Sequence, residues 1–172
     1  MDYLCAWCKQ PLLKKDSDAT NHSISHGICE KCRFELEYNR IPIQDLLNEM
    51  DGPILMQNSD GRVFAANHAA QNTLKKKISE IQGKLRGDVI ECVYAALPGG
   101  CGYTEHCSAC IIRQTVQITH ETGQSQNGIK ASHFHITPKG PKRYWITIST
   151  EKVGDAVLLR IDDMQPFLEN SS

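Results

Sequence analysis

The residues most suited to chemistry lie near the middle of the chain, where residues 92–110 read CVYAALPGGCGYTEHCSAC. This stretch holds four of the eight cysteines: Cys92, Cys101, Cys107 and Cys110. The last two form a C-x2-C pair, and the Pro-Gly-Gly sequence at 98–100 predicts a turn that folds Cys92 back toward them. Because disulfides are rare in a reducing compartment, cysteines at such spacings more often bind a metal or do redox chemistry.

Three kinds of centre fit these four thiols. Four thiolates bind a structural Zn2+ in tetrahedral geometry. They also bind an iron–sulfur cluster, whose ligand spacings vary widely, or they act as a redox thiol switch. Tyr103 and His106 are candidate accessory groups that would shield the centre or donate hydrogen bonds to sulfur. We predict Zn2+ or an iron–sulfur cluster at this central site, with the thiol switch as the third alternative; Cys92 also fits simple apolar packing.

Residues 1–40 carry the other four cysteines as two C-x2-C pairs, Cys5 with Cys8 and Cys29 with Cys32, and 20 residues separate the pairs. This spacing is typical of a four-cysteine zinc site, in which each pair lies on a tight turn. The residues between the pairs are polar and supply little to bury, so we expect this module to need its metal for order. His22 and His26 are alternative ligands, His26 being the stronger one. We predict that the four cysteines bind Zn2+ and that both histidines stay outside the coordination shell.

The elements that must position the central site follow from the spacing of apolar residues. Residues 41–51 form a predicted linking helix, because apolar side chains at 43, 46, 47 and 50 fall on one helical stripe. Residues 54–56 and 62–66 are predicted strands, joined by the hairpin signal Asp60-Gly61. Asn67 is placed to cap the short helix that follows.

A second group of helices leads into and out of the cysteines. The basic run at 75–77 is predicted to be a solvated helix face, with Ile78, Ile81, Leu85 and Val89 docking that helix. From Ser108 the pattern is helical again, and Gly123 is the expected stop. One stripe of this helix consists of Ile111, Ile112, Thr115, Val116 and Thr119. Cys107 and Cys110 fall in or just before its first turn, where the unpaired N–H groups of a helix favour thiolates.

Three predicted strands complete the domain, at residues 128–137, 142–151 and 155–162. The middle strand alternates Tyr144, Ile146 and Ile148 with more polar positions, which suits an antiparallel sheet with one wetter face. His133 and His135 share a face at spacing two. We expect them on a solvent-facing surface rather than as ligands.

Parts of this pattern resemble known families of signalling proteins. A strand, the Asp60-Gly61 turn, a strand with Val63-Phe64 and then Asn67 resemble the opening of a PAS domain, in which this asparagine commonly holds the turn into the first helix. The stretch GDVIEC followed by GGCGYTEHCSACIIR resembles a cysteine-bearing subset of PAS domains from bacterial sensor proteins. CAWCK with SHGICEKC resembles a cysteine-rich module found beside PAS domains, often in sensor kinases, although the glycine–tryptophan pair usual in that module is missing here.

The predicted fold class is therefore α+β. A PAS-like five-stranded antiparallel sheet with flanking helices, in the order β-β-α-β-β-β, is preceded by a small zinc-ribbon-like module with four cysteines and by a linking helix. The predicted domains are the zinc module at 1–40, the linking helix at 41–51, the PAS-like sensor domain at 52–165 and a tail at 166–172.

Composition limits the function. The formal net charge of −1 gives no electrostatic footprint for nucleic acid or for an anionic membrane. No apolar run is long enough to cross a bilayer, and the first ten residues do not resemble a signal peptide, so we expect a cytoplasmic protein. An all-cysteine site leaves no open position for a catalytic water, so no enzymatic activity is predicted.

The predicted function is sensing of redox state, oxygen or metal at the central cysteines. The signal would pass to a protein partner, such as a histidine kinase or another signalling protein, or through a homodimer. The alternative is a non-catalytic adaptor that binds a protein through its sheet face and whose two zinc sites are purely structural.

Overall fold

The computed structural model describes residues 43–168. The predicted N-terminal zinc module, with Cys5, Cys8, Cys29, Cys32 and His26, lies outside these residues and stays a prediction. The described part contains the predicted five-stranded antiparallel sheet, in the spatial order β2-β1-β5-β4-β3. Its strands are β1 (Ile54–Gln57), β2 (Val63–Ala66), β3 (Gln126–Thr137), β4 (Gly140–Val153) and β5 (Ala156–Pro166). This five-stranded antiparallel sheet with flanking helices, in the order β-β-α-β-β-β, confirms the fold class predicted for this part of the chain.

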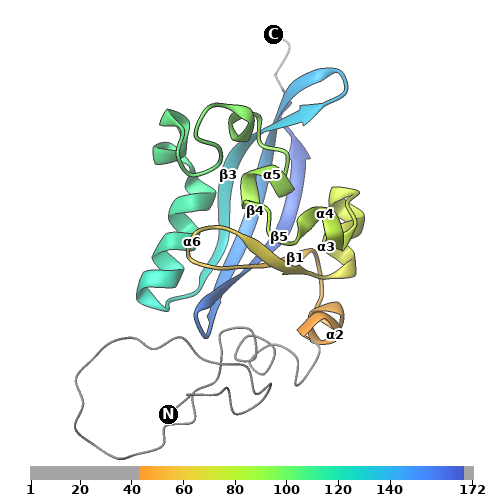
Figure 1. The fold of residues 1–172 in the computed structure, drawn as a ribbon, viewed down its shortest axis with the longest axis vertical. Helices are drawn as coiled ribbons and strands as arrows, with labels where there is room; N and C mark the ends of the chain where they lie inside the picture. Colours follow the sequence, from red (N-terminus) through yellow and green to blue (C-terminus); the bar gives the residue numbers. More distant parts are fainter. Residues whose placement is uncertain (1–42, 169–172) are drawn as a thin grey trace, which may run out of the picture. The chain divides into compact units, whose positions relative to one another are not determined.

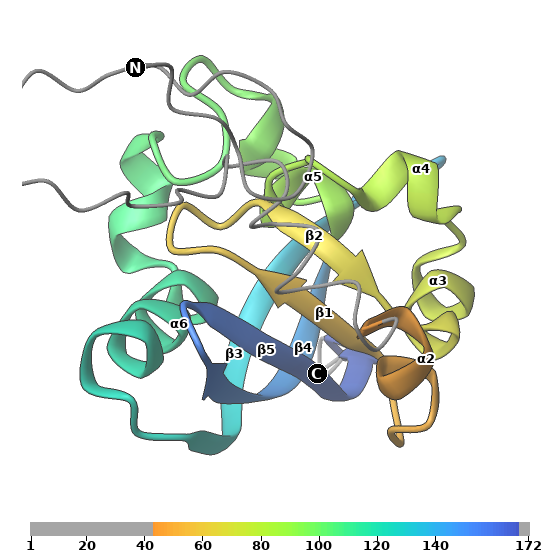
Figure 2. The ribbon, with the colours of Figure 1, turned by 60° about the horizontal axis from the view of Figure 1, so that its bottom comes forward.

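Of the helical elements, α6 packs near β3 and β4, α4 near β2 and α3 near β1 (Figures 1 and 2). Their bounds are α2 (Ile43–Asn48), α3 (His68–Leu74), α4 (Ile78–Ile81), α5 (Arg86–Val89) and α6 (Ile111–Thr122). Two 3-10 helices, η1 (Val93–Ala96) and η2 (Glu105–Ala109), lie between α5 and α6. Within residues 43–168, the helices are too short or too polar to span a bilayer.

The core forms between the sheet and these helices, as the alternating patterns predicted. Ile146 and Ile148 of β4 pack with Leu159 and Ile161 of β5 and with Ile112 and Val116 of α6. The predicted stripe of α6 is confirmed, except that Ile111 is exposed, and Gly123 ends the helix in a left-handed conformation with φ 72°. The prediction for the basic run at 75–77 is wrong. Lys75 takes a left-handed φ of 54° at the end of α3, and the chain then forms only the short helices α4 and α5, separated by Gly83.

Neighbouring segments of the chain pair with parts of both edge strands of the sheet, β2 and β3. Along β2, the N–H of Val63 donates to Lys84, and the Val63 carbonyl accepts from Gly83. Along β3, the N–H of Ile136 donates to Glu91, and His135 pairs with Cys92 in an isolated bridge. The cysteine loop, residues 91–110, therefore contacts the edge strand β3 at the end nearest the turn into β4.

The outward face of β3 and β4 corrects one further expectation, that Phe134 and Trp145 sit on opposite faces or ends of the sheet with at least one buried. Phe134 lies directly across from Arg143, which shares its face with Trp145. The Arg143 guanidinium lies 5.7 Å from the Phe134 ring centre and 5.5 Å from that of Trp145. Both rings are half-buried and share one face, because the register places them one diagonal step apart.

Candidate metal centre

The four central cysteines surround one small cavity of about 40 Å³. Cys92 comes just before η1, Cys107 lies in η2, and Cys110 stands at the N-terminus of α6. Cys101 lies in the turn between η1 and η2. All four are free thiols, with Cys107 buried and the other three half-buried. The four cysteines therefore line the same cavity, and their role as ligands of one centre stays a prediction.

Backbone N–H groups point at two of the sulfurs. The Gly87 N–H donates to Cys101 Sγ at 3.3 Å, and the Gly102 N–H donates to Cys107 Sγ at 3.1 Å. The Thr104 hydroxyl is also 3.2 Å from Cys107 Sγ. Such donors stabilise a thiolate more than a neutral thiol, and hydrogen bonds to sulfur are a usual feature of cysteine-ligated metal centres.

These contacts divide the thiols into two kinds. Burial raises the pKa of the Cys101 thiol, and the charge of Arg86 and the Gly87 N–H only partly oppose it. Burial also raises the pKa of Cys92. At Cys107 burial acts in the same direction, but the hydrogen bonds from Thr104 and Gly102, together with the Arg113 charge, outweigh it and lower the pKa. Of Cys92, Cys101 and Cys107, Cys107 is therefore the thiol that ionises most readily.

The spacing of the candidate ligand side chains bears on the kind of centre that they could hold. Within residues 43–168, no group of three or more His, Cys, Asp or Glu side chains lies close enough together to hold a single metal ion. The four cysteines nevertheless surround the same cavity. An iron–sulfur cluster joins its cysteine ligands through several iron and sulfide atoms, so its ligand sulfurs lie farther apart than those around one ion.

A buried arginine adjoins the cysteines. Arg86 is only 4 % exposed, and its Nη1 donates to Gln57 Oε1 at 2.6 Å. In the described part of the chain, no carboxylate lies within ion-pair distance of this guanidinium. Burial lowers the Arg86 pKa, whereas the charges of Cys101, Cys110 and Cys107 act to raise it. Sequence reasoning missed Arg86, because an arginine in LRGDV carries no signal of burial.

His133 and His135 correct the expectation of a solvent-facing surface. Both rings point toward the loop, where His133 Nε2 and His135 Nδ1 lie 3.1 Å and 3.0 Å from the carbonyl oxygen of Ile90. Because a carbonyl only accepts, each ring nitrogen carries a proton and donates it. His133 is 5 % exposed and lines the cysteine cavity, and its burial lowers its pKa to about 4. The ring is therefore neutral at physiological pH.

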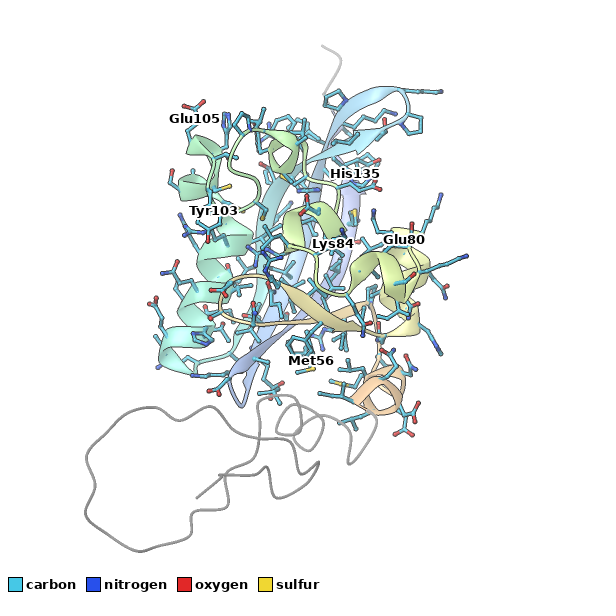
Figure 3. All side chains as sticks on the ribbon, in the orientation of Figure 1. Met56, Glu80, Lys84, Tyr103, Glu105 and His135 are labelled. Carbon is cyan, nitrogen blue, oxygen red and sulfur yellow. The ribbon has the colours of Figure 1, made fainter. Side chains whose placement is uncertain are left out.

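The predicted accessory residues have different surroundings. His106 lines the cavity and stacks on Tyr94, with ring centres 3.9 Å apart. Tyr103 is 75 % exposed and lies outside the lining of the cavity. Figure 3 shows Tyr103 and Glu105 on the loop that leads into α6, and His135 on the strand beyond it. Of the two predicted accessory residues, His106 and Tyr103, only His106 lines the cavity beside the cysteines.

Comparison with known proteins finds similarity at low sequence identity among solved structures. No family model and no curated protein matches the chain. Among solved structures, the quorum-sensing receptor PAS domain of Cronobacter turicensis RpfR in complex with BDSF is 16 % identical, with 67 % of this chain and 95 % of that chain covered and a TM-score of 0.43. A domain of a sensory box sensor histidine kinase/response regulator from Geobacter sulfurreducens is 12 % identical, covers 74 % and 96 %, and has a TM-score of 0.47. A Rhodobacter sphaeroides LOV protein is 11 % identical, covers 83 % and 71 %, and has a TM-score of 0.48.

Proposed function

We propose that this protein is a PAS-type sensor in which Cys92, Cys101, Cys107 and Cys110 hold an iron–sulfur cluster that responds to redox state or oxygen. The observation that carries the proposal is the convergence of four free thiols on one cavity, with backbone N–H groups directed at two of the sulfurs. Cysteines that served only as small apolar residues would need neither the convergence nor the donors.

A centre that all four cysteines ligate fits the site better than a thiol switch between one pair, and we take this centre to be an iron–sulfur cluster. The four thiols line one cavity, and the ligand spacings of iron–sulfur sites vary widely. The two sulfurs with N–H donors also bond to different backbone segments, which favours a centre that all four ligands share over a switch between one pair. The cluster would supply one-electron chemistry, and the chain supplies the thiolates, the N–H donors and the dry surroundings.

The loop has direct routes to the rest of the domain. At its start, Cys92 pairs with His135, and Glu91 accepts the N–H of Ile136, so the loop is bonded to β3. At its end, Cys110 is the residue from which α6 begins. A change in the size or charge of the centre would therefore alter the packing between β3 and α6. The output would go to a protein partner, such as a histidine kinase, or to a second copy of the chain.

The experiment is to purify the protein without oxygen and to measure its absorption spectrum, iron, sulfide and zinc. We expect a brown protein whose colour fades in air, and loss of the colour when Cys101, Cys107 or Cys110 is replaced by serine. The double variant Cys5→Ser/Cys8→Ser is the matched control, because it removes two thiols outside the proposed centre and should keep the colour. A colourless protein with zinc at both cysteine sets would instead favour the adaptor with two structural zinc sites.

For the N-terminal set we propose Zn2+, on the strength of the paired C-x2-C spacing alone. Removal of this zinc by a chelator should make residues 1–40 sensitive to protease while the sheet domain stays intact. Equal cleavage of this segment with and without metal would contradict the proposal.

A further inference from the structure

Arg86 is a buried cation that lacks an anionic protein partner in the described part of the chain. Its backbone is fixed at the start of α5, where its N–H donates to the Gly61 carbonyl at 2.7 Å. Its side chain runs beneath the β1–β2 turn, since an ideal Cβ placed on Gly61 would lie 3.6 Å from Arg86 Nη1. A guanidinium has five N–H donors, and Gln57 Oε1 takes only one hydrogen bond here. A buried charge without an opposite charge is strongly destabilising, so this position requires an acceptor.

Gln57 increases the excess of donors. The residue is fully buried on β1, its Oε1 is used by Arg86, and its Nε2 has no hydrogen-bond partner. The two side chains together offer several N–H groups and only one acceptor atom, Gln57 Oε1. In native structures an unsatisfied buried group of this kind often marks an ion or ligand.

The thiolates of the cysteine centre are the candidate negative charges for Arg86. Gly87, the next residue after Arg86, presses against Cys101, because an ideal Cβ on Gly87 would lie 2.7 Å from the Cys101 sulfur. Arg86 also lines the cavity that the four cysteines surround. Asp60 and Glu121 line a second cavity of about 210 Å³, which Arg86 and Cys101 also line, but both carboxylates are exposed and neither pairs with Arg86.

We infer that Arg86, held by Gln57, is the counter-ion of the cysteine centre and raises its reduction potential. This inference rests on the proposed function. Four thiolates and a cluster carry net negative charge, and reduction adds one electron from a one-electron donor without breaking a bond. A fixed positive charge in a low-dielectric site stabilises the more negative, reduced form. Arg86 is in this sense a positioning and tuning residue, and it ligates no iron.

The test is a potentiometric titration of the cluster-loaded full chain with dithionite and redox mediators. Arg86→Gln removes the charge and keeps N–H donors, so it should lower the reduced-to-oxidised ratio at a given potential at least tenfold, which equals 59 mV for a one-electron couple. Arg86→Lys keeps the charge and should retain most of the wild-type potential. Arg160→Gln is the matched control, because Arg160 is exposed and pairs with Asp162 at 2.6 Å. The reduction potential of the cluster in this variant should equal that in the wild type.

The outcomes separate this inference from the proposed function. A cluster with an unchanged potential in Arg86→Gln would overturn the role of Arg86 and leave the cluster in place. If Arg86→Gln folds but takes up no cluster, restoration of cluster content and potential by Arg86→Lys supports the counter-ion role, and failure to restore them overturns it. If the wild type takes up no cluster, the proposed function fails. The inference is then tested by Co2+ binding to the thiols. It is overturned if the Co2+ affinity of Arg86→Gln is less than threefold weaker than the affinity of the wild type.

Discussion

Asn67 and Arg86 are both buried polar residues that bond to β1 or its flanks, yet their surroundings differ. Asn67 Oδ1 accepts the N–H groups of Ile54 and Ala70, and its Nδ2 donates to the carbonyls of Leu47 and Gly52. All four hydrogen-bonding positions of this amide are therefore used by the backbone. Arg86 has one hydrogen bond from its side chain, and its neighbour Gln57 keeps an unused donor.

The difference indicates which buried polar groups serve the fold and which serve a ligand. The Asn67 network closes on itself and ties α2, β1 and α3 together, so its purpose is complete within the chain. The Arg86–Gln57 pair does not close within the described residues, which is the observation behind the counter-ion role inferred for Arg86. Four changes, in order of expected effect on stability, test this contrast.

Asn67→Ala should cause the largest loss of stability. It leaves buried backbone donors and acceptors without partners, and we expect the free energy of unfolding to fall by about 4 kcal/mol. Urea denaturation of the metal-free protein measures this loss. Asn72→Ala, on the exposed side of α3, is the control and should have little effect. If Asn67→Ala lost less than Gly87→Ala, the view of Asn67 as a purely structural network would be wrong.

Acid should destabilise the protein through His133. Its pKa is about 4 in the fold against 6.5 for the ordinary group, so below pH 6.5 the unfolded chain binds a proton that the native state does not. The free energy of unfolding should fall progressively from pH 6.5 and be lower by about 3 kcal/mol at pH 4. In His133→Gln, which keeps an N–H for the Ile90 carbonyl, this part of the pH dependence should vanish. His68→Gln, at an exposed histidine, should keep it.

Gly87→Ala should damage the centre more than the fold. The new Cβ would overlap Cys101, whose Cβ and Sγ are both 2.7 Å away, so the loop must move at a cost of about 2 kcal/mol. Cluster content should drop several-fold in the same variant. Gly83→Ala is a matched control: Gly83 has φ 77° and no neighbour within 4 Å of an ideal Cβ, so it costs about 1 kcal/mol of backbone strain and leaves the cluster content unchanged.

Gln57→Glu should have the smallest effect on stability, and its sign should depend on the centre. In the metal-free protein the new carboxylate pairs with Arg86 and stabilises the fold by about 1 kcal/mol. In the loaded protein it competes with the thiolates for the same guanidinium, so cluster content or reduction potential should fall. Gln57→Met, without charge, separates the two effects. The same sign in both states would contradict the role of Arg86.

The fold was predictable because its elements carry periodic or turn signals. The Asp60-Gly61 turn, the cap at Asn67 and the alternation around Ile146 gave the sheet and its order along the chain. The prediction for the segment between α3 and α5 was wrong, because each of the helices there has only four residues. A helix of that length is too short to show a periodic stripe, so the sequence does not distinguish two short helices from one continuous helix. Four of the five described strands are also longer than predicted, with β5 reaching Pro166, whereas β2 is one residue shorter.

The candidate site was predictable only as far as its cysteines. Their spacing indicated a shared centre, and the position of Cys110 before a helix followed from the stripe that begins at Ile111. Arg86, Gln57 and His133 were not recognisable, because their burial depends on contacts between segments about 30 to 45 residues apart, such as Arg86 with Gln57 and His133 with Ile90. No local pattern in one sequence encodes such contacts.

The partly covered edge of β3 has a consequence for aggregation. Among the described residues, this edge is paired at Ile136 and His135 by the start of the cysteine loop. Its other end is protected by a bulge at Gly128, with φ 63°, and by the exposed Lys130, both of which discourage the addition of a foreign strand. A protein whose cysteine loop loses its order would expose unpaired N–H and C=O groups at the end that neither device protects. Loss of the centre should therefore lead to self-association through β3, visible by light scattering before the sheet itself unfolds.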